Sequence, residues 1–253
     1  MTQRVLITAG AGGIGLAIAK AFAAKGARVH IADVNAEAVQ AITTQYPAIS
    51  GTVGDISKPA DLDTLFANVQ TQLGGLDVLI NNAGIAGATA PVADYPLDTW
   101  NAVVNLNLTG TFMVTQRAIP LLKASPAASI LVMSSLAGRF GYPNRVAYST
   151  TKWGLVGFTK TLSLELGPHG ITANSIHPGA VDGPRLQSVF EGRAKVSGRT
   201  VDEETDLAMA NQAVKKFIDP ADIAALAVFL AGPHARTISG QMFPIDGDSK
   251  TAG

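Results

Sequence analysis

Tyr148 and Lys152 are the two residues whose types and spacing most directly suggest chemistry. Both lie in the stretch Tyr-Ser-Thr-Thr-Lys, which has a helical pattern, and a separation of four places both side chains on one helix face. A free phenol titrates near pH 10, too high for a base at neutral pH. An ammonium group about 4 Å away would favour the phenolate by at most about 4 kcal/mol at an effective dielectric of 20. The pair therefore predicts a tyrosine that exchanges a proton with a substrate oxygen.

Two further polar residues could complete such a site. Ser135 follows the apolar run 129–134 and precedes Tyr148 by thirteen residues, and Asn107 lies in a helical stretch. Each residue also has an ordinary structural interpretation: an exposed helical pair, a strand-end cap, or a satisfied polar group in a helix. The combination favours a catalytic interpretation, in which Ser135 donates a hydrogen bond to the substrate oxygen.

A glycine-rich loop lies near the amino end of the chain. The segment Thr8-Ala9-Gly10-Ala11-Gly12-Gly13-Ile14-Gly15 follows a short apolar run and opens into an alanine-rich helical pattern. Backbone N–H groups in such a loop can approach a diphosphate, and the helix N-terminus adds about half a positive charge. Gly10, Gly13 and Gly15 are the expected positions of close approach, because the loop has the required strand–loop–helix context.

Asp33 follows this loop at a spacing that is typical of dinucleotide sites. It ends the second predicted strand, eighteen residues after Gly15. A carboxylate there can accept both hydroxyls of the adenosine ribose of NAD, and it repels the 2′-phosphate of NADP. The following residues, Val34-Asn35-Ala36, include no cation. We therefore expect NAD rather than NADP, although a strand-end turn residue is the plainer alternative.

The elements that must position these residues alternate along the chain. Strands are expected near 5–8, 28–33, 50–55, 78–80, 129–134, 172–177 and 241–245, and helices near 14–25, 35–45, 60–73, 97–122, 146–166 and 220–231. The alternation predicts right-handed crossovers in one α/β domain, residues 1–253, with a doubly wound sheet of about seven mostly parallel strands and helices on both faces. The polar segment 183–215 lacks a strand pattern, and we expect it to form a substrate lid.

Composition excludes several classes of protein. Of 253 residues, 47% are hydrophobic, and Lys+Arg and Asp+Glu each total 19, so nothing favours nucleic acid or an anionic membrane as partner. The absence of cysteine excludes disulfides and cysteine zinc sites, and the four histidines show no metal-ligand spacing. We expect no metal, no membrane span, no signal peptide and a cytoplasmic location.

Taken together, these motifs resemble the short-chain dehydrogenases/reductases in their common single-domain form. The resemblance covers nearly the whole chain and includes the glycine loop, Asp55, Asn81-Asn82-Ala83-Gly84, Pro178-Gly179 and the closing Asp246-Gly247. It implies a Rossmann-type fold and a catalytic tetrad of Asn107, Ser135, Tyr148 and Lys152, in which Asn107 holds a water that connects Lys152 to solvent. It also implies cofactor contacts by the following residues: Gly10, Gly13, Ile14, Gly15, Asp33, Asp55, Ile56, Asn82, Ala83, Gly84, Tyr148, Lys152, Pro178, Gly179 and Val181.

The chain departs from the family pattern at two informative positions. Ala9 stands where the family normally has glycine, and Gly183 stands where it often has a threonine that holds the nicotinamide carboxamide. The second difference leaves backbone groups near Val181 as the expected partners of the carboxamide. In relatives, the helices that match 97–122 and 146–166 pair subunits, so the resemblance also implies a homotetramer.

The substrate is less well defined by the sequence. Arg139, Asn144, Arg145 and Arg185 are candidates for substrate binding, and arginines there would suit a polar or anionic molecule. Salt bridges with Asp182, Glu191 or acids of the 183–215 segment are an equal alternative. We expect hydride transfer between NAD(H) and a secondary alcohol or ketone such as a polyol, sugar or hydroxy acid. The alternatives are an NADPH-dependent carbonyl or 3-oxoacyl reductase and a non-catalytic nucleotide-sensing protein.

Overall fold

A single seven-stranded sheet forms the centre of the molecule. The computed structural model describes residues 2–252, and its strands follow the order β3-β2-β1-β4-β5-β6-β7 with every pair parallel. Their bounds are β1 Arg4–Thr8, β2 Arg28–Asp33, β3 Ile49–Val53, β4 Val78–Asn81, β5 Ser129–Met133, β6 Thr172–Pro178 and β7 Met242–Ile245. The predicted doubly wound fold is confirmed, and the sheet is wholly parallel.

The central strands are apolar because both faces of the sheet are covered. Val5, Leu6 and Ile7 of β1 are all fully buried, as are Leu79 and Ile80 of β4. A strand with only one covered face would alternate polar and apolar residues, whereas these read as continuous apolar runs. This explains why the strands could be recognised in the sequence.

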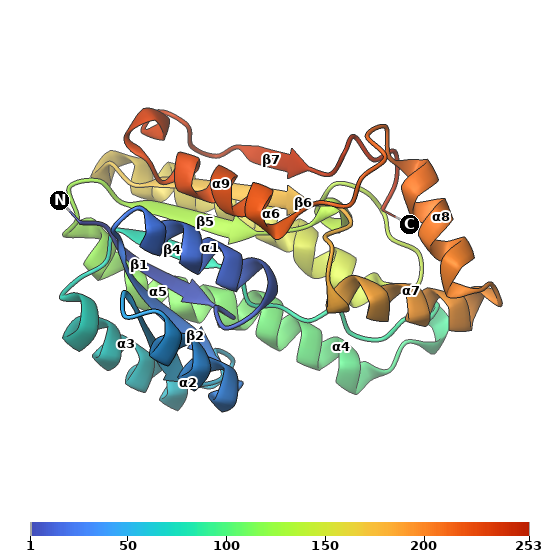
Figure 1. The fold of residues 1–253 in the computed structure, drawn as a ribbon, viewed down its shortest axis with the longest axis horizontal. Coiled ribbons are helices and arrows are strands. Elements are labelled where there is room, and N and C mark those ends of the chain that lie inside the picture. Colours follow the sequence, from blue (N-terminus) through green and yellow to red (C-terminus); the bar gives the residue numbers. More distant parts are fainter. Residues whose placement is uncertain (1, 253) are drawn as a thin grey trace.

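Three helices cover one face of the sheet. They are α1 Gly13–Ala24, α2 Ala36–Gln45 and α9 Pro220–Leu230, and α1 packs against α9 although some 200 residues separate them (Figure 1). Ile18 and Phe22 of α1 and Ile223 and Leu230 of α9 are fully buried in their shared core. This packing fixes the amino end of α1 at the edge of the sheet where the glycine loop lies.

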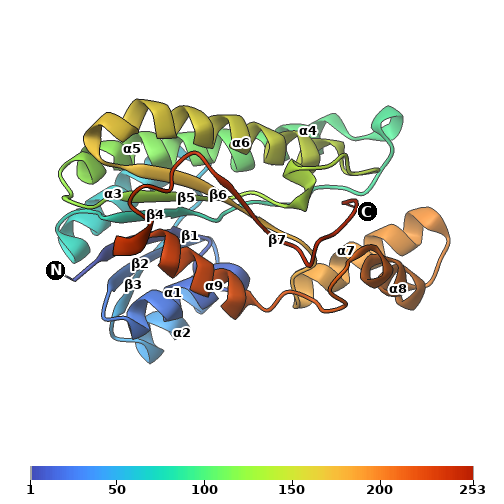
Figure 2. The same cartoon turned by 90° about the horizontal axis from the view of Figure 1, so that it is seen from above.

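The opposite face is covered by α3 Pro59–Leu73, α5 Thr111–Lys123 and α6 Val146–Leu166, with α4 Leu97–Val104 continuing the layer (Figure 2). Leu62 of α3, Val114 of α5 and Leu155 of α6 belong to one buried core. Between α4 and α5, residues 105–110 form a π-helical turn rather than a plain α-helix. Such turns insert an extra residue into a helix and are frequent at functional sites.

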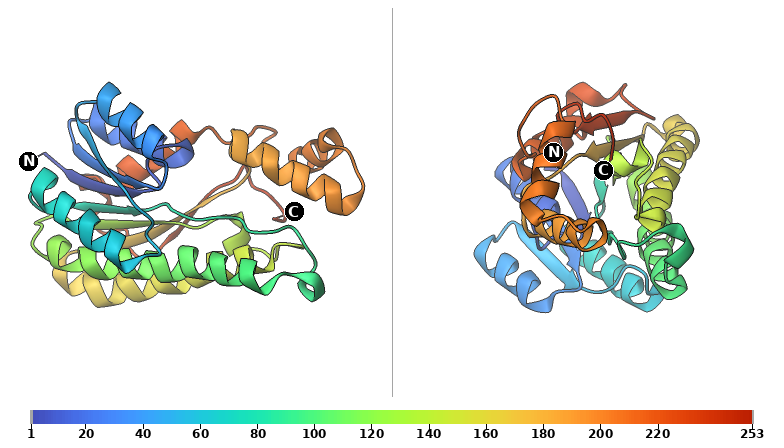
Figure 3. Two further views of the ribbon diagram at one scale, coloured as in Figure 1. Left: turned by 90° about the horizontal axis from the view of Figure 1, so that it is seen from below. Right: turned by 90° about the vertical axis from the view of Figure 1, so that its right-hand side faces the viewer.

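The segment 183–215 forms two helices that project beyond the sheet (Figure 3). They are α7 Pro184–Ser197 and α8 Val201–Asn211. Thr200 and Glu203 form a reciprocal capping box that starts α8, with Thr200 Oγ1 accepting from the Glu203 backbone N–H at 3.1 Å. The segment is therefore ordered helix that rises over the carboxyl ends of the strands.

Candidate active site

The main cavity lies at the carboxyl ends of the strands, where the order reverses between β1 and β4. This is the switch point at which doubly wound sheets bind ligands. The cavity has a volume of about 540 Å³. Thirteen of the residues predicted for the site line it: Gly13, Ile14, Asp33, Asn82, Gly84, Ser135, Arg145, Tyr148, Lys152, Pro178, Gly179, Val181 and Arg185. The remaining eight lie outside its lining: Gly10, Gly15, Asp55, Ile56, Ala83, Asn107, Arg139 and Asn144.

The glycines of the loop serve two different purposes. Gly12 and Gly13 face open space, and Gly13 has a φ of +49°. A Cβ on Gly15 would lie 2.1 Å from the carbonyl oxygen of Ala9, and one on Gly10 would lie 2.6 Å from Ile31. Gly10 and Gly15 are thus required for packing inside the protein, while Gly12 and Gly13 leave room for a ligand against the N-terminus of α1.

The loop is held to β4 by hydrogen bonds between Thr8, Ala9 and Asn82. The Oγ1 of Thr8 accepts from the backbone N–H groups of Asn82 and Ala83, each at 3.0 Å. The amide of Asn82 donates to the carbonyl oxygens of Thr8 at 3.1 Å and Ala9 at 3.0 Å. These contacts fix the two strand ends that border the cavity.

Asp33 lies at the glycine-loop end of the cavity. One carboxylate oxygen accepts from the Ala11 N–H at 3.0 Å and the other from the Asn35 N–H at 3.1 Å. The carboxylate is thus oriented by the loop, and Asp33 lines the cavity. In contrast, Asp55 accepts from the backbone and hydroxyl of Ser57 at 2.9 and 2.7 Å, and together with Ile56 it borders a separate small depression.

Tyr148 and Lys152 lie together at the other end of the cavity, one helical turn apart on α6. The ammonium nitrogen of Lys152 is 5.5 Å from the centre of the Tyr148 ring and donates to the Met133 carbonyl at 2.8 Å. Lys152 is buried, whereas Tyr148 is partly exposed to the cavity. The predicted pairing on one helix face is present.

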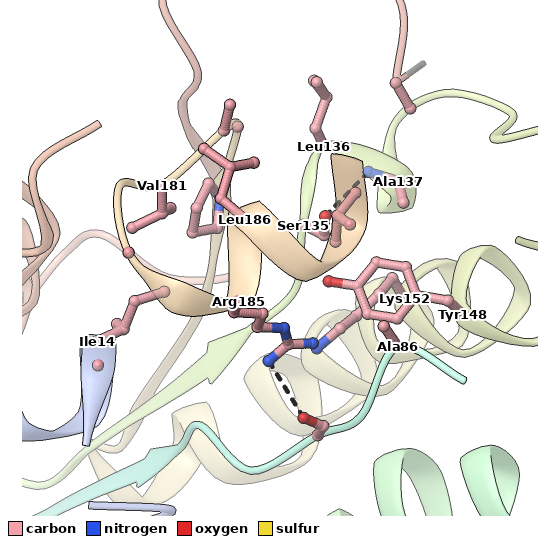
Figure 4. A pocket seen from close by; sticks show the side chains of 18 of the residues that line it. Ile14, Ala86, Ser135, Leu136, Ala137, Tyr148, Lys152, Val181, Arg185 and Leu186 are labelled. Atoms are coloured by element: carbon pink, nitrogen blue, oxygen red, sulfur yellow. Dashed lines mark hydrogen bonds between the residues drawn. The ribbon is translucent and has the colours of Figure 1, made fainter. Parts of the chain in front are cut away.

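The surroundings of Tyr148 favour its ionised form. Burial raises the pKa of Tyr148, but Lys152, Arg185 and Arg145 and a hydrogen bond with Ser135 outweigh it and hold the pKa below its ordinary value. Burial has the opposite effect on the ammonium group and lowers the pKa of Lys152. Figure 4 shows the Tyr148 phenol and the Ser135 hydroxyl facing the same space, with the Arg185 guanidinium beside them. A phenol in this environment is suited to proton transfer.

Ser135 is positioned by contacts that the sequence did not reveal. Its Oγ accepts from the Ala137 N–H at 3.2 Å, which leaves the hydroxyl proton available. The buried ring of His177 contacts the Ser135 carbonyl oxygen through Nδ1 at 3.0 Å and the Ser175 hydroxyl through Nε2 at 2.8 Å. Burial lowers the pKa of His177 to about 4, so the ring is neutral and Nδ1 carries the proton donated to Ser135.

Asn107 lies behind the cavity, fully buried in the π-helical turn. Its Oδ1 accepts from the Ile85 N–H at 2.9 Å, and its amide nitrogen donates to the Ile85 carbonyl and the Thr151 hydroxyl, each at 3.0 Å. A Cβ on Gly84 would lie 3.1 Å from Asn107 Oδ1 and 3.5 Å from Lys152 Nζ. Asn107 therefore holds the segment 84–85 against Lys152.

Beyond β6, the chain passes close to its own closing segment. A Cβ on Gly179 would lie 2.9 Å from the Cα of Asp246. Val181 pairs with Ile218 through two hydrogen bonds, which use the Ala180 carbonyl at 2.8 Å and the Asp182 N–H at 3.0 Å. The backbone N–H and carbonyl of Val181 are not used in this bridge.

The candidate substrate arginines have different environments. Arg139 pairs with Asp246 at 2.6 Å rather than with Asp182 or Glu191. Arg185 donates to the Gly84 carbonyl at 3.2 Å, as Figure 4 shows, and its guanidinium lies 5.9 Å from the Tyr148 ring. Arg145 is buried and lines the cavity. Asn144 takes a left-handed conformation with a φ of +62°.

One wall of the cavity consists of residues that no sequence motif had indicated. Ser249, Thr251 and Ala252 line it, together with Asn211 and Gln212 at the end of α8. The amide of Asn211 donates to the Thr251 carbonyl at 2.7 Å. Such contacts between α8 and a segment some 40 residues later depend on tertiary packing and have no local pattern.

Residues 2–252 contain neither a membrane-spanning helix nor a metal-binding cluster. No helix in this range is long and apolar enough to cross a membrane. Nor does it hold any group of three or more histidine or acidic side chains that could bind a metal ion.

Comparison with known proteins agrees with this geometry. Residues 9–247 match the family described as enoyl-(acyl carrier protein) reductase. The chain is 36% identical to D-beta-hydroxybutyrate dehydrogenase of Cupriavidus necator, over 97% of this chain and 96% of the relative. It is 34% identical to galactitol 2-dehydrogenase of Agrobacterium fabrum, over 96% and 95% of the two chains.

Solved structures of similar fold are also oxidoreductases. An NAD+-bound xylitol dehydrogenase superposes with a TM-score of 0.93 at 29% identity and covers 97% of this chain and 98% of its own. A variant of actinorhodin polyketide ketoreductase with NADPH superposes with a TM-score of 0.92 at 30% identity, over 97% and 96% of the two chains. The chain belongs to the short-chain dehydrogenase/reductase family and is an NAD(P)-dependent oxidoreductase that acts on CH–OH groups.

Proposed function

We propose that the protein transfers a hydride between NAD(H) and a polar secondary alcohol or its ketone, of the polyol, sugar or hydroxy-acid class. The observation that carries this proposal is the meeting of Tyr148, Lys152 and Ser135 at one end of a cavity whose other end holds the glycine loop and Asp33. The relatives named for hydroxybutyrate and galactitol support the substrate class.

The residues at the glycine-loop end fit a dinucleotide. Gly12 and Gly13 leave open space at the N-terminus of α1, where unpaired N–H groups favour a diphosphate. Asp33, oriented by the Ala11 and Asn35 N–H groups, would accept the ribose hydroxyls. Other predicted cofactor residues that line the same cavity are Ile14, Asn82, Gly84, Pro178, Gly179 and Val181. We therefore favour NAD over NADP.

The reaction requires a proton to move as the hydride moves. NAD+, when bound, supplies the hydride acceptor. Tyr148 takes the proton from the alcohol oxygen during oxidation and returns it during reduction. Lys152 stabilises the phenolate through its charge, and Ser135 orients the substrate oxygen with its hydroxyl group. Asn107 holds the 84–85 segment beside Lys152, and a water near it would connect Lys152 to solvent.

The proposal extends to the whole molecule. Residues 1–253 act as one catalytic domain, with 183–215 as the lid over the substrate. The α4–α5 and α6 surfaces pair subunits in a homotetramer, and the protein works in the cytoplasm. The relatives named as ketoacyl reductases favour a second candidate, an NADPH-dependent reductase of carbonyl or 3-oxoacyl groups.

Replacing Tyr148 tests the proposal most directly. Tyr148→Phe removes the hydroxyl and keeps the ring, so we expect kcat/KM to fall by about 100- to 10,000-fold while the Kd for NAD stays within about threefold. Steady-state kinetics on a panel of polyols and hydroxy acids, with NAD+ and NADP+, gives both the activity and the cofactor preference. Turnover retained by the variant would remove Tyr148 from its role, and a marked preference for NADPH and 3-oxoacyl esters would favour the second candidate.

A further inference from the structure

Arg145 is a buried cation that contacts no anion. It occupies the N-cap position of α6, and only 4% of its surface is exposed. Its Nε is completely buried without a hydrogen-bond partner. Among residues 2–252, no hydrogen bond from any nitrogen of its guanidinium and no ion pair to a carboxylate is present. A buried charge in this condition is costly unless something else binds it.

The neighbours of Arg145 do not compensate its charge. The guanidinium lies 5.9 Å from the Tyr142 ring, at the limit of a cation–π contact. Burial has the largest effect on the pKa of Arg145 and lowers it; Tyr142 opposes this shift, Arg193 adds to it, and Tyr148 and Tyr95 oppose it more weakly. The Arg145 side chain also reaches α7, since a Cβ on Gly192 would lie 3.7 Å from its Nη2.

The other two arginines of the cavity already have neutral acceptors. Arg193 donates to the Tyr142 hydroxyl and to the Ala252 carbonyl, the latter at 3.0 Å. Arg185 donates to the Gly84 carbonyl. Arg185 and Arg193 both add positive charge to the cavity, and neither of them accepts a hydrogen bond from Arg145.

No acid in the cavity balances these cations. The carboxylates among its lining residues are Asp33 and Asp182. Asp33 is oriented by the glycine loop at the far end, and Asp182 is exposed and takes part in none of the ion pairs found within residues 2–252. The Tyr148 end of the cavity therefore has an excess of positive charge and an open guanidinium.

We propose that Arg145 binds the carboxylate of the substrate, which is a short-chain hydroxy acid or the matching oxo acid. The planar fork of a guanidinium fits a carboxylate with two parallel hydrogen bonds. Arg145 is the N-cap residue of α6, three positions before Tyr148; both line the cavity, and the charge of Arg145 acts on the Tyr148 phenol. The carboxylate and the reacting carbon are therefore separated by few bonds. This inference rests on the proposed function and narrows its substrate class.

The overall reaction balances. The carbinol C–H bond breaks and its hydride passes to NAD+, while the hydroxyl proton leaves through Tyr148. The products are the oxo acid, NADH and one proton. The carboxylate remains ionised throughout and is neither formed nor consumed.

The test compares acids with their uncharged methyl esters. Wild-type protein, Arg145→Lys, Arg145→Met and the surface control Arg28→Met are assayed with NAD+ on 2-hydroxybutanoate, 3-hydroxybutanoate and 4-hydroxypentanoate and on the three esters. Xylitol and galactitol serve as neutral alcohols. We expect the wild-type protein and Arg28→Met to prefer the best acid over its ester by about 10- to 100-fold in kcat/KM. The ratio of kcat/KM for the acid to kcat/KM for its ester should be intermediate in Arg145→Lys and close to one in Arg145→Met.

Other results would overturn the inference and separate its failure from that of the proposed function. Oxidation of xylitol or galactitol, with no preference for any acid, leaves the proposed function standing and removes the carboxylate role. No turnover of any alcohol with either cofactor overturns both. An unchanged acid-to-ester ratio in Arg145→Met together with weaker NAD binding would assign Arg145 to the cofactor. If Arg145→Met does not bind NAD because it does not fold, the wild-type and Arg145→Lys ratios decide.

Discussion

The charge around the Tyr148 phenol determines how the enzyme should respond to pH. Alcohol oxidation needs the phenolate, so its kcat/KM should rise as pH increases through the lowered pKa of Tyr148 and level off above it. Arg185, 5.9 Å from the ring, contributes one of the cations that lower this pKa. Arg185→Met should therefore move the profile to higher pH.

A matched surface variant gives the control for this experiment. Arg28→Met also removes one positive charge, but Arg28 lies at the start of β2, the end of the sheet opposite to the cavity. Its pH profile should overlay that of the wild-type protein. If the pH dependence of kcat/KM is the same in Arg185→Met as in the wild-type protein, Arg185 does not act on the phenol.

Asp33 gives a second prediction at the scale of single residues. Asp33→Asn removes the negative charge but keeps an oxygen that can accept from the Ala11 N–H. Without the repulsion between the Asp33 carboxylate and the 2′-phosphate, NADP+ should bind at least about tenfold more tightly, while NAD+ binding weakens. Fluorescence titration with both cofactors measures the change. Unchanged affinity for NADP+ would mean that Asp33 does not face the 2′ position.

At the scale of elements, the glycine loop contains a strained residue. Ala9 has a φ of +50°, a left-handed conformation that costs an L-residue about 1–2 kcal/mol. Glycine has no such penalty, but it increases the conformational entropy of the unfolded chain, which offsets part of the gain in stability. We expect Ala9→Gly to raise the free energy of unfolding by about 0.5 kcal/mol in urea titrations. Ala11→Gly makes the same chemical change where φ is not positive, and it should lower that free energy.

The elements that position the site were largely predictable, for physical reasons. Parallel strands buried on both faces appear as apolar runs, so β1, β4 and β5 stood out. The four-residue spacing of Tyr148 and Lys152 is enforced by the helix itself. Placing Ser135 opposite them required the family resemblance, since nothing local connects β5 to α6.

Other parts of the site could not be predicted because they arise from tertiary packing. Arg145 was among the candidates for substrate binding, but its burial could not be predicted, because it depends on the packing of α7, whose Gly192 lies beside it. The contact of His177 with Ser135 joins residues 42 positions apart. The helices of the segment 183–215 were not predicted, since α7 and α8 have few buried positions, namely Phe190 and Glu204.

At the scale of the whole molecule, exposed apolar side chains on one helical layer support subunit pairing. Phe112 of α5 and Trp153 of α6 are each 49% exposed, and Leu97 of α4 is 70% exposed. Large apolar surface of this kind marks interaction sites. The proposed homotetramer would cover it.

A charge placed in this surface tests the assembly. We expect wild-type protein to run as a tetramer in light scattering and Phe112→Asp to dissociate. Leu207→Asp, on the exposed surface of α8 with 48% exposure, should remain tetrameric. A wild-type monomer, or a Phe112→Asp variant that stays tetrameric, would contradict the proposed interface.

The position of β7 at the edge of the sheet has a consequence for biosynthesis. On the ribosome, β1, β2 and β3 emerge before the other strands and can pair with one another early, whereas β7 can dock on β6 only after residues 242–245 have been made. Asp246, which binds Arg139 beside the Ser135 turn, arrives with it. A nascent chain halted before this point would carry the glycine loop and Tyr148 but lack the wall of the cavity formed by Ser249, Thr251 and Ala252, so turnover should begin only after these residues have been made.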